Sequence, residues 1–379
     1  MIYFDNAATT LYKPRSVAKA MEAAMLSCAN PGRSGHAPAM RAAETVYRCR
    51  ETAAEMFHLP CPEQVVFTSN ATHALNIAIK SVLHGGGHAV VSGYEHNSVV
   101  RPLEAMKEQG VCYTVAQSGL FCPEQAVQAV QEALRSDTRC VILNHISNVF
   151  GFVLPLKEID ALCAQRQIAL IVDVSQSAGL LDVDASELES ARFLCMPGHK
   201  SLYGPQGTGL LLVCKAEGFY SLMQGGTGSE SLNLSQPDFL PDALESGTLN
   251  VPGIAGLREG LLFVKKQGTA ALAQHKRELV EQAAQGLGSI PGVRVFCGPA
   301  ERHQGLISFA AQGQTPAELC ARLAQRGICL RDGLHCSPLA HRSAGTLPEG
   351  TCRVSFSCFN TRREVSELVF AVKKVLTSA

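Results

Sequence analysis

The sequence lacks several features that would assign it at once to a common class of protein. No apolar run approaches the roughly 20 residues of a membrane-spanning helix, and Met1-Ile-Tyr-Phe-Asp5 lacks the basic and long apolar regions of a secretory signal. Its 33 Lys and Arg balance its 33 Asp and Glu, so net charge favours neither nucleic acid nor a membrane surface. We therefore expect a soluble, cytoplasmic protein that binds neither.

Cysteine is abundant, with 15 residues, but the spacings that give it common roles are missing. There is no Cys-x-x-Cys pair and no Cys and His set at zinc-finger spacing, so we expect no metal site. Cys140, Cys195, Cys214 and Cys329 lie in apolar runs and are explained as small core residues. Because no export signal is present, this pattern predicts reduced thiols.

Two glycine-rich segments resemble functional loops but lack the residues that would complete them. His84-Gly-Gly-Gly87 is similar to an esterase oxyanion loop, yet no Gly-x-Ser-x-Gly sequence occurs. Gly204-Pro-Gln-Gly207-Thr-Gly209 is not followed by the Gly-Lys-Ser/Thr of a P-loop. We interpret the second segment as tight turns.

Apolar runs typical of strands alternate with helical patterns over much of the 379-residue chain. The predicted strands are residues 65–68, 88–91, 111–115, 140–143, 168–172, 191–195 and 210–213. Strands joined by helices of ten or more residues require crossover connections, which predict an α/β fold with a mostly parallel sheet. Functional side chains are then expected on loops beyond the strand ends.

The last third of the chain has a different pattern. Short strands are predicted at residues 293–296, 306–310 and 352–356, with helices at 270–287, 315–326 and 361–376, the last beginning with a Thr361/Glu364 capping box. We therefore predict a large α/β domain over residues 14–255 and a smaller α+β domain from residues 1–13 and 256–379. The polar segment 214–250 has no clear periodicity, which is typical of a functional or interface loop.

A lysine and an aspartate suggest the chemistry. Asp173 ends the apolar strand 168–172, and Lys200 lies in the glycine-rich loop between two later strands. A lone loop lysine is usually a solvated surface residue. Together, however, the pair suits pyridoxal phosphate, which needs a lysine amine for its Schiff base and an acidic partner for its pyridine nitrogen.

Other polar residues directly follow predicted strands, so their loops are expected to converge. Thr72 begins a helix, where a hydroxyl and the helix amino terminus favour an anion, although a simple N-cap is the alternative. His96 could stack on an aromatic cofactor and move protons, or it could be a hydrogen-bonded structural histidine. Arg33 and His36 are candidates for substrate binding in a loop of solvated residues.

One cysteine lies in a polar loop near the carboxyl terminus. Cys336 is flanked by Arg331 and His335, and positive charge from these neighbours is expected to favour its thiolate. An incidental loop cysteine is the alternative interpretation. Arg353, on a later strand, is suited to bidentate pairing with a substrate carboxylate.

Together these motifs resemble the class V aminotransferase family, and within it the cysteine desulfurases of the Suf type and the selenocysteine lyase and NifS-like enzymes. The residues that carry the resemblance are Asp5-Asn6-Ala-Ala-Thr-Thr10, Glu95-His96, Asp173-x-x-Gln176, His199-Lys200-x-Leu-Tyr-Gly-Pro-x-Gly, Glu245-x-Gly-Thr248-x-Asn250 and Arg331-x-Gly-x-His335-Cys336. They occur in order over nearly the whole chain. The resemblance implies a fold-type I pyridoxal phosphate enzyme that works as a homodimer.

The resemblance also implies roles at the cofactor. Lys200 would form the Schiff base, Asp173 would pair with the pyridine nitrogen, and Gln176 would reach the phenolic oxygen. His96 would stack on the ring and take part in catalysis. The remaining cofactor residues are Thr72 and His199 at the phosphate, Thr248 at the phosphate of the partner subunit, and His73.

The implied reaction converts L-cysteine to L-alanine and leaves the sulfur on Cys336 as a persulfide, for sulfur metabolism and iron–sulfur cluster assembly. Asn148 and Arg353 match the positions that bind the substrate carboxylate, and Arg331 and His36 complete the candidate substrate-binding set. A sulfur-acceptor protein is an expected partner.

Departures from the family pattern leave alternatives open. Pro197 stands where a phosphate-binding serine or threonine is common, and we expect His73 to compensate. The alternatives are another class V reaction, such as an aminotransferase, an epimerase, or a selenocysteine or cysteine-sulfinate lyase, and a sulfur-transfer protein that needs a partner for turnover.

Overall fold

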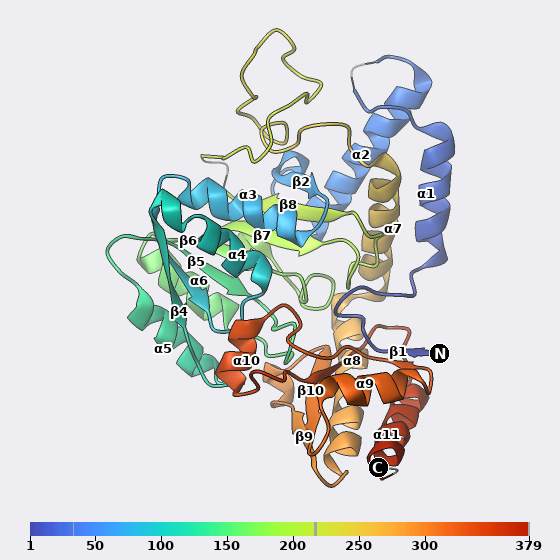
Figure 1. The fold of residues 1–379 in the computed structure, drawn as a ribbon. Coiled ribbons are helices and arrows are strands. Elements are labelled where there is room, and N and C mark those ends of the chain that lie inside the picture. The colour runs from blue at the N-terminus through green and yellow to red at the C-terminus, as the bar shows by residue number, and fades with distance from the viewer. Residues whose placement is uncertain (33, 216–217, 378–379) are drawn as a thin grey trace.

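A seven-stranded sheet forms the centre of the larger part of the molecule (Figure 1). The computed structural model describes residues 1–32, 34–215 and 218–377, so the candidate Arg33 lies outside the described residues. The strands are β2 (Val65–Thr68), β3 (Gly87–Ser92), β4 (Val111–Ala116), β5 (Thr138–Asn144), β6 (Ala169–Asp173), β7 (Ala191–Pro197) and β8 (Gly209–Val213). The seven predicted strands are therefore confirmed, with bounds that differ by two residues or fewer.

The strand order across this sheet is β2-β8-β7-β6-β5-β3-β4. β8 runs antiparallel to both β2 and β7, and all other neighbours pair in parallel. The mostly parallel sheet is confirmed. The carboxyl ends of β2, β3, β5, β6 and β7 therefore lie along one edge, where open α/β sheets place their ligand sites.

Helices cover both faces of the sheet, and each face has its own apolar core. One face packs against α3 (Ala71–Leu83) and α4 (Asn97–Ala105). The other packs against α2 (Ala37–Met56), α5 (Pro123–Ala133), α6 (Leu156–Gln165) and α7 (Val251–Gln267). Successive strand residues point to opposite faces, so Leu170 and Val172 of β6 enter one core and Ile171 enters the other.

A smaller α+β unit lies below this sheet in Figure 1, as predicted. Its antiparallel sheet has the order β12-β10-β9, from β9 (Val293–Phe296), β10 (Leu306–Ala311) and β12 (Cys352–Ser355). Its helices are α8 (Thr269–Gly288), α9 (Pro316–Ala324), α10 (Pro338–Ala344) and α11 (Arg362–Thr377). The capping box is confirmed, because Thr361 and Glu364 each accept the other's backbone amide.

The amino terminus belongs to the same layer as this smaller unit. β1 (Ile2–Tyr3) pairs in parallel with β11 (Ile328–Cys329), and α1 (Arg15–Ser27) then packs beside α7. The predicted domain limit between residues 255 and 256 falls inside α7, which is one continuous helix. The domain division therefore stays a prediction.

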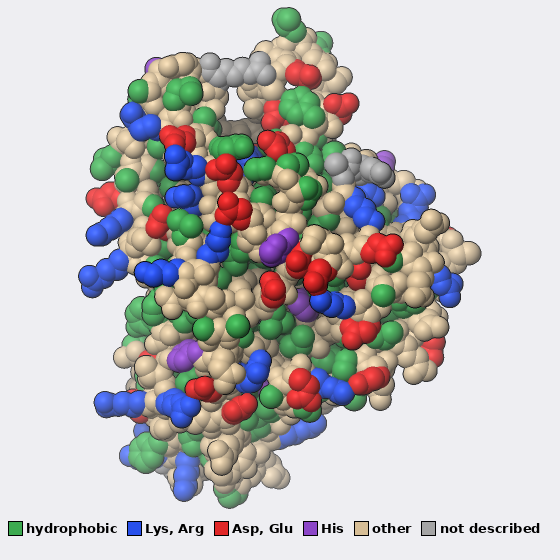
Figure 2. Space-filling model, turned by 180° about the vertical axis from the view of Figure 1, so that it is seen from behind, with side chains coloured by type: hydrophobic (Ala, Val, Ile, Leu, Met, Phe, Trp, Pro, Cys, Tyr) green, Lys and Arg blue, Asp and Glu red, His purple; other side chains and the backbone are tan. Residues whose placement is uncertain are grey.

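Segment 214–250 forms neither a helix nor a strand in its described residues and projects at the top of Figure 1. Among the described helices, none combines the length and apolar character needed to cross a bilayer. On the face shown in Figure 2, basic and acidic side chains are interspersed, with no extended area of one sign. That face therefore gives no electrostatic signature of a polyanion partner.

Helix α7 presses closely on the chain that follows Lys200. A Cβ atom at Gly260 would overlap the carbonyl oxygen of Leu202 and lie 2.8 Å from the amide nitrogen of Gly204. Both of these atoms belong to the backbone, so they cannot rotate away as a side chain would. Glycine at position 260 is thus required by a close approach of two backbones.

We expect Gly260→Ala to lower the free energy of unfolding by about 1–3 kcal/mol, because overpacking outweighs the better helix propensity of alanine. Urea unfolding measures the change. Gly288→Ala is the matched control, since Gly288 also lies in a helix but has no heavy atom within 4 Å of an added Cβ. Equal stability of the two variants would contradict the close packing.

Candidate active site

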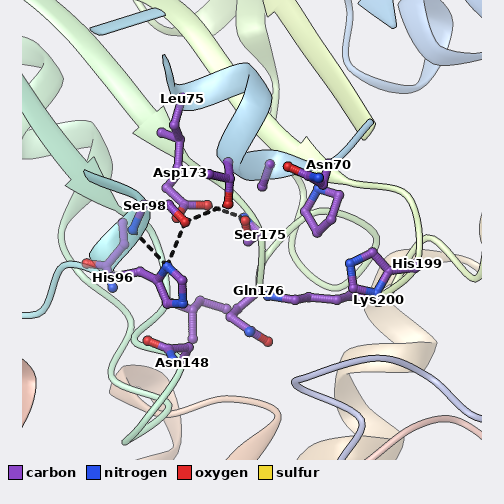
Figure 3. Close-up of a pocket in the computed structure, with 15 residues that line it drawn as sticks. Asn70, Leu75, His96, Ser98, Asn148, Asp173, Ser175, Gln176, His199 and Lys200 are labelled. Atoms are coloured by element: carbon purple, nitrogen blue, oxygen red, sulfur yellow. Dashed lines mark hydrogen bonds between the residues drawn. The ribbon is translucent and has the colours of Figure 1, made fainter. Parts of the chain in front are cut away.

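A cavity lies at the carboxyl edge of the large sheet, and Figure 3 shows the residues that line it. Seven of the predicted site residues share this cavity: Thr72, His96, Asn148, Asp173, Gln176, His199 and Lys200. They lie at or just beyond the carboxyl ends of β2, β3, β5, β6 and β7, which the strand order places along one edge. The parallel topology therefore brings together residues that are up to 128 positions apart, from Thr72 to Lys200.

Lys200 extends into the cavity, and Asp173 lies at the end of β6 (Figure 3). Burial lowers the pKa of Lys200 to about 8, and the charges of Arg353 and Arg331 act in the same direction, while Asp173 partly opposes the shift. Asp173 is almost fully buried, and one of its carboxylate oxygens accepts the amide of Ser175 at 2.9 Å. At neutral pH a useful fraction of Lys200 is therefore an uncharged amine, which can act as a nucleophile or a base.

His96 caps α4 and is held by Ser98. The backbone amide of Ser98 donates to Nδ1 of His96 at 3.0 Å, and the Ser98 hydroxyl lies 2.9 Å from the same nitrogen. Burial and the charge of Lys200 lower the pKa of His96 to about 4, so the ring is neutral near pH 7. Because Nδ1 accepts, the ring proton lies on Nε2.

Thr72 continues this chain of hydrogen bonds, because its hydroxyl lies 2.8 Å from that of Ser98. The prediction that Thr72 begins the helix is wrong by a small margin. Helix α3 begins at Ala71, and Asn70 is its N-cap, because the Asn70 side chain accepts the amide of His73 at 2.9 Å. Asparagine is among the best N-cap residues, so its side chain takes the role we had considered for threonine.

The amino terminus of α3 forms one end of the cavity and is suited to an anion. His199 faces the same cavity, and its buried Nδ1 has no hydrogen-bond partner among the described residues. Burial lowers the pKa of His199 to about 4, with Lys200 adding to the shift, so this histidine is neutral. His73 is the third residue of α3 but does not line the cavity, while Pro197 does.

The amino-terminal segment contacts two of the residues that line the cavity. Gln176 donates from Nε2 to the carbonyl of Ala7 at 3.0 Å, and Thr10 donates to the carbonyl of His199 at 3.0 Å. Pairing of β1 with β11 fixes the start of this segment. Residues 7–10 therefore help to position both Gln176 and the loop that carries Lys200.

Arg353 is almost fully buried and does not itself line the cavity, but it contacts Asn148, which does. Its guanidinium donates to the carbonyl of Asn148 at 2.8 Å and to the Asp5 carboxylate at 2.7 Å, while its Nε has no partner among the described residues. Arg353 thus already holds one carboxylate. The sequence reasoning did not identify Asp5 as the partner of Arg353.

Cys336 is exposed and does not line the cavity, yet its loop adjoins it. The carbonyl of Cys336 accepts the amide of Asn97 at 2.7 Å, and a guanidinium nitrogen of Arg331 lies 3.9 Å from its sulfur. The expectation that His335 adds positive charge is wrong. His335 is buried, and this burial, together with the Arg353 charge, holds its pKa well below its usual range, so of these two neighbours Arg331 is the one that supplies positive charge.

Two predicted site residues lie elsewhere in the chain. Thr248 lines a second cavity with Arg50 and Glu245, whose side chains form a buried ion pair. His36 is exposed and caps α2 by accepting the amide of Ala39 at 3.3 Å. Within a single chain, neither residue lines the cavity around Lys200.

The pKa of Lys200 yields a direct test on protein freed of aldehydes with hydroxylamine. We expect acetylation of Lys200 to rise with pH around a midpoint near 8. Asp173→Asn removes a charge that raises this pKa, so labelling at pH 7 should become roughly threefold faster or more. Mass spectrometry of the Lys200 peptide measures the rate.

The exposed Lys373 corrects for reagent reactivity in the same sample, and Asp137→Asn, an exposed acidic position, serves as the matched variant. An unchanged Lys200 rate in Asp173→Asn would show that the two groups do not interact.

Comparison with known proteins gives consistent results. A probable cysteine desulfurase from Methanothermobacter thermautotrophicus is 31% identical over 381 residues, covering 97% of this chain and 92% of that protein. Another from Mycolicibacterium paratuberculosis is 31% identical over 385 residues, but this chain spans only 55% of its length.

Solved structures agree in fold. An apo cysteine desulfurase from Thermococcus onnurineus NA1 superposes with a TM-score of 0.93 at 27% identity, covering 100% of this chain and 95% of that one. The cysteine desulfurase CsdA from Escherichia coli gives 0.88 at 28% identity, covering 99% and 94%. The predicted fold-type I architecture is confirmed. The model of the aminotransferase class-V family matches residues 2–368, so the chain belongs to that family.

Proposed function

We propose that the protein is a pyridoxal phosphate-dependent cysteine desulfurase, which converts L-cysteine to L-alanine and transfers the sulfur to Cys336. One observation carries the proposal. The loop of Cys336 is hydrogen-bonded to the backbone of Asn97, the residue after His96, beside the cavity that contains Lys200 and Asp173. A thiol next to a lysine–aspartate cofactor site is what sulfur abstraction from an amino acid needs.

The residues of the cavity fit pyridoxal phosphate. Lys200 offers a partly neutral amine, Asp173 a carboxylate for the pyridine nitrogen, and the α3 amino terminus an anion site. The partnerless Nδ1 of His199 faces the same cavity, where it could bond with the cofactor. The position of His73 in the first turn of α3 supports a role near the phosphate. Once bound, pyridoxal phosphate supplies an electron sink for negative charge at the substrate α-carbon.

Lys200 and His96 would move protons in this reaction. The lowered pKa of Lys200 lets its amine take the α-proton of the substrate near neutral pH. His96 is neutral and carries its proton on Nε2, with Nδ1 fixed by Ser98, so it can donate a hydrogen bond from Nε2 without adding charge. The Ser98 contacts also hold the ring in one orientation, as stacking on a planar cofactor requires.

Arg353 and Asn148 would recognise the substrate carboxylate. Arg353 is buried and positive, and its unpartnered Nε leaves part of its hydrogen-bonding capacity available. Asp5 holds the guanidinium until substrate arrives. The charge of Arg331 helps to lower the pKa of Lys200, and its guanidinium also lies beside the Cys336 sulfur. Arg331 would therefore act electrostatically on both residues.

The sulfur transfer is a balanced exchange. The Cys336 thiolate attacks the substrate sulfur, an S–S bond forms, and the carbon–sulfur bond breaks. The bond electrons stay with the β-carbon, which takes up a proton on the way to L-alanine. One thiol and L-cysteine thus become one persulfide and L-alanine, and no external oxidant is required.

The protein would then deliver sulfur to an acceptor, for example in iron–sulfur cluster assembly. A reducing compartment such as the cytoplasm suits this chemistry, and all 15 cysteines are free thiols in the structure. An aminotransferase or epimerase would leave the Cys336 loop without a role, which is why desulfuration is preferred.

A homodimer would complete the cofactor site. The family resemblance assigns Thr248 to the phosphate of the partner subunit, and Thr248 indeed lies apart from the cavity of its own chain. Leu232 and Leu234 are fully exposed in segment 218–250, and α1 and α2 expose Leu26 and Met40. Exposed apolar side chains of this kind favour burial against another copy, and Figure 2 shows hydrophobic side chains on the projecting segment.

Two substitutions separate the steps of the reaction. Lys200→Ala should abolish L-alanine formation from L-cysteine, with at least a ~10³-fold loss, because no amine remains to move the proton. Cys336→Ala should keep cofactor absorbance but lose persulfide formation. Amino-acid analysis measures alanine, and mass spectrometry of the Cys336 peptide measures added sulfur.

Cys112→Ala is the control for the thiol, since Cys112 is also exposed but lies on β4 at the sheet edge. It should retain normal alanine formation. The desulfurase proposal fails if wild-type protein with bound cofactor forms no alanine from L-cysteine, and the acceptor role fails if Cys336→Ala still releases sulfide at the normal rate.

The dimer is tested by sedimentation equilibrium. Wild-type protein should sediment at twice the 40.4 kDa of one chain, and Leu232→Gln with Leu234→Gln should weaken association by about tenfold or more, because apolar burial is lost. Leu347→Gln, an exposed leucine outside that segment, is the control. A monomeric wild-type protein would contradict the dimer.

A further inference from the structure

The loop that carries Cys336 has a strained backbone. His335 and Cys336 have φ angles of 51° and 57°, two consecutive residues in the left-handed region. Side chains other than glycine are crowded there, so such conformations persist only where neighbouring groups hold them. Loss of the contacts that hold this loop would therefore allow it to leave this conformation.

One side chain supplies much of that restraint. The amide of Asn148 donates from Nδ2 to the carbonyl of His335 at 2.9 Å, and its Oδ1 accepts the hydroxyl of Ser337 at 2.7 Å. Both ends of the Asn148 amide are thus bonded to the loop, one on each side of Cys336. Ser337 is completely buried, and Asn148 is only 9% exposed, so water does not readily replace these bonds.

Asn148 also belongs to the cavity. It lines the same cavity as Lys200 and His96, and its carbonyl accepts Arg353 at 2.8 Å. A group that enters the cavity and bonds the Asn148 amide therefore competes directly with the loop. Cys336 is exposed and does not line the cavity, so in the proposed reaction the loop would shift to bring its sulfur to a bound substrate.

We propose that Asn148 and Ser337 form a clamp that holds the Cys336 loop in its strained conformation, and that a substrate carboxylate releases the clamp by taking the Asn148 amide. The second half of this proposal rests on the proposed function, in which Asn148 binds that carboxylate. Ser337 acts as a positioning residue, since it acts only through Asn148. The substrate whose sulfur Cys336 accepts would then also release the Cys336 loop.

The amide of Asn97 reports on the clamp from outside the loop. This amide donates to the carbonyl of Cys336 at 2.7 Å, so it is protected only while the loop stays in place. In the holoenzyme, Ser337→Ala should accelerate hydrogen exchange at Asn97 by about tenfold, as expected for one lost buried hydrogen bond. Exchange is followed by mass spectrometry of peptides that contain Asn97 and the Cys336 loop.

Ser343→Ala is the matched control. Ser343 is close in sequence and its hydroxyl also donates one hydrogen bond, but to the backbone carbonyl of Gly93 at 2.9 Å and not to Asn148. Its loss should leave exchange at Asn97 unchanged. Normal protection in Ser337→Ala, or equal acceleration in both variants, would overturn the clamp.

The substrate-sensitive half is tested with L-alanine, which has the amino and carboxylate groups but no sulfur. Saturating L-alanine should accelerate Asn97 exchange in wild-type holoenzyme by about the same factor as Ser337→Ala, and should add little to that variant. If L-alanine binds, as cofactor absorbance reports, yet leaves wild-type exchange unchanged, release by the carboxylate is refuted.

Asn148→Asp provides a second variant, because its carboxylate still accepts from Ser337 but cannot donate to His335. It should also accelerate exchange at Asn97, and full protection in this variant would count against the clamp. None of these exchange measurements requires turnover. Failure of the clamp is thus distinguishable from failure of the desulfurase proposal, which the production of alanine from cysteine decides.

Discussion

The electrostatic interaction between the buried Lys200 amine and Asp173 is the constraint on which the rest of the site depends. Burial lowers the pKa of Lys200 to about 8, while Asp173 partly restores the charged form. Without the carboxylate the lysine would be a weaker base, and without burial it would be a fully charged surface group. The parallel sheet makes this balance possible, since β6 and β7 are neighbours and end at the same edge.

The second constraint is that the site is built from both ends of the chain. Asp5 and Arg353 form an ion pair across 348 positions, and Arg353 also bonds the carbonyl of Asn148. Arg353 is buried, so removing Asp5 would leave its charge poorly compensated. The smaller α+β unit thus does more than cover the sheet: under the proposed function it would supply both the cation for the substrate carboxylate and the loop that accepts the sulfur.

The sequence was a good guide wherever the chemistry is local or set by strand order. All seven strands of the large sheet were predicted, as was the Thr361/Glu364 capping box, because periodicity and cap residues are short-range signals. It was a poor guide to the exact start of a helix and to the burial of a loop side chain. The N-cap of α3 proved to be Asn70, and the buried His335 proved to be neutral, because neither a helix start within one residue nor burial can be read from a loop sequence.

By itself, then, the sequence determined the α/β architecture, the family and the set of chemically capable side chains, since motif spacing and apolar periodicity are properties of the linear chain. Only the tertiary structure decided which of these side chains meet. It placed Thr248 and His36 away from the cavity of their own chain, joined Thr72 to His96 through Ser98, and bonded Asn148 to the loop of Cys336. Hydrogen bonds and charges act over a few ångströms, and the distances between residues that are remote in sequence are fixed only when the two units pack together.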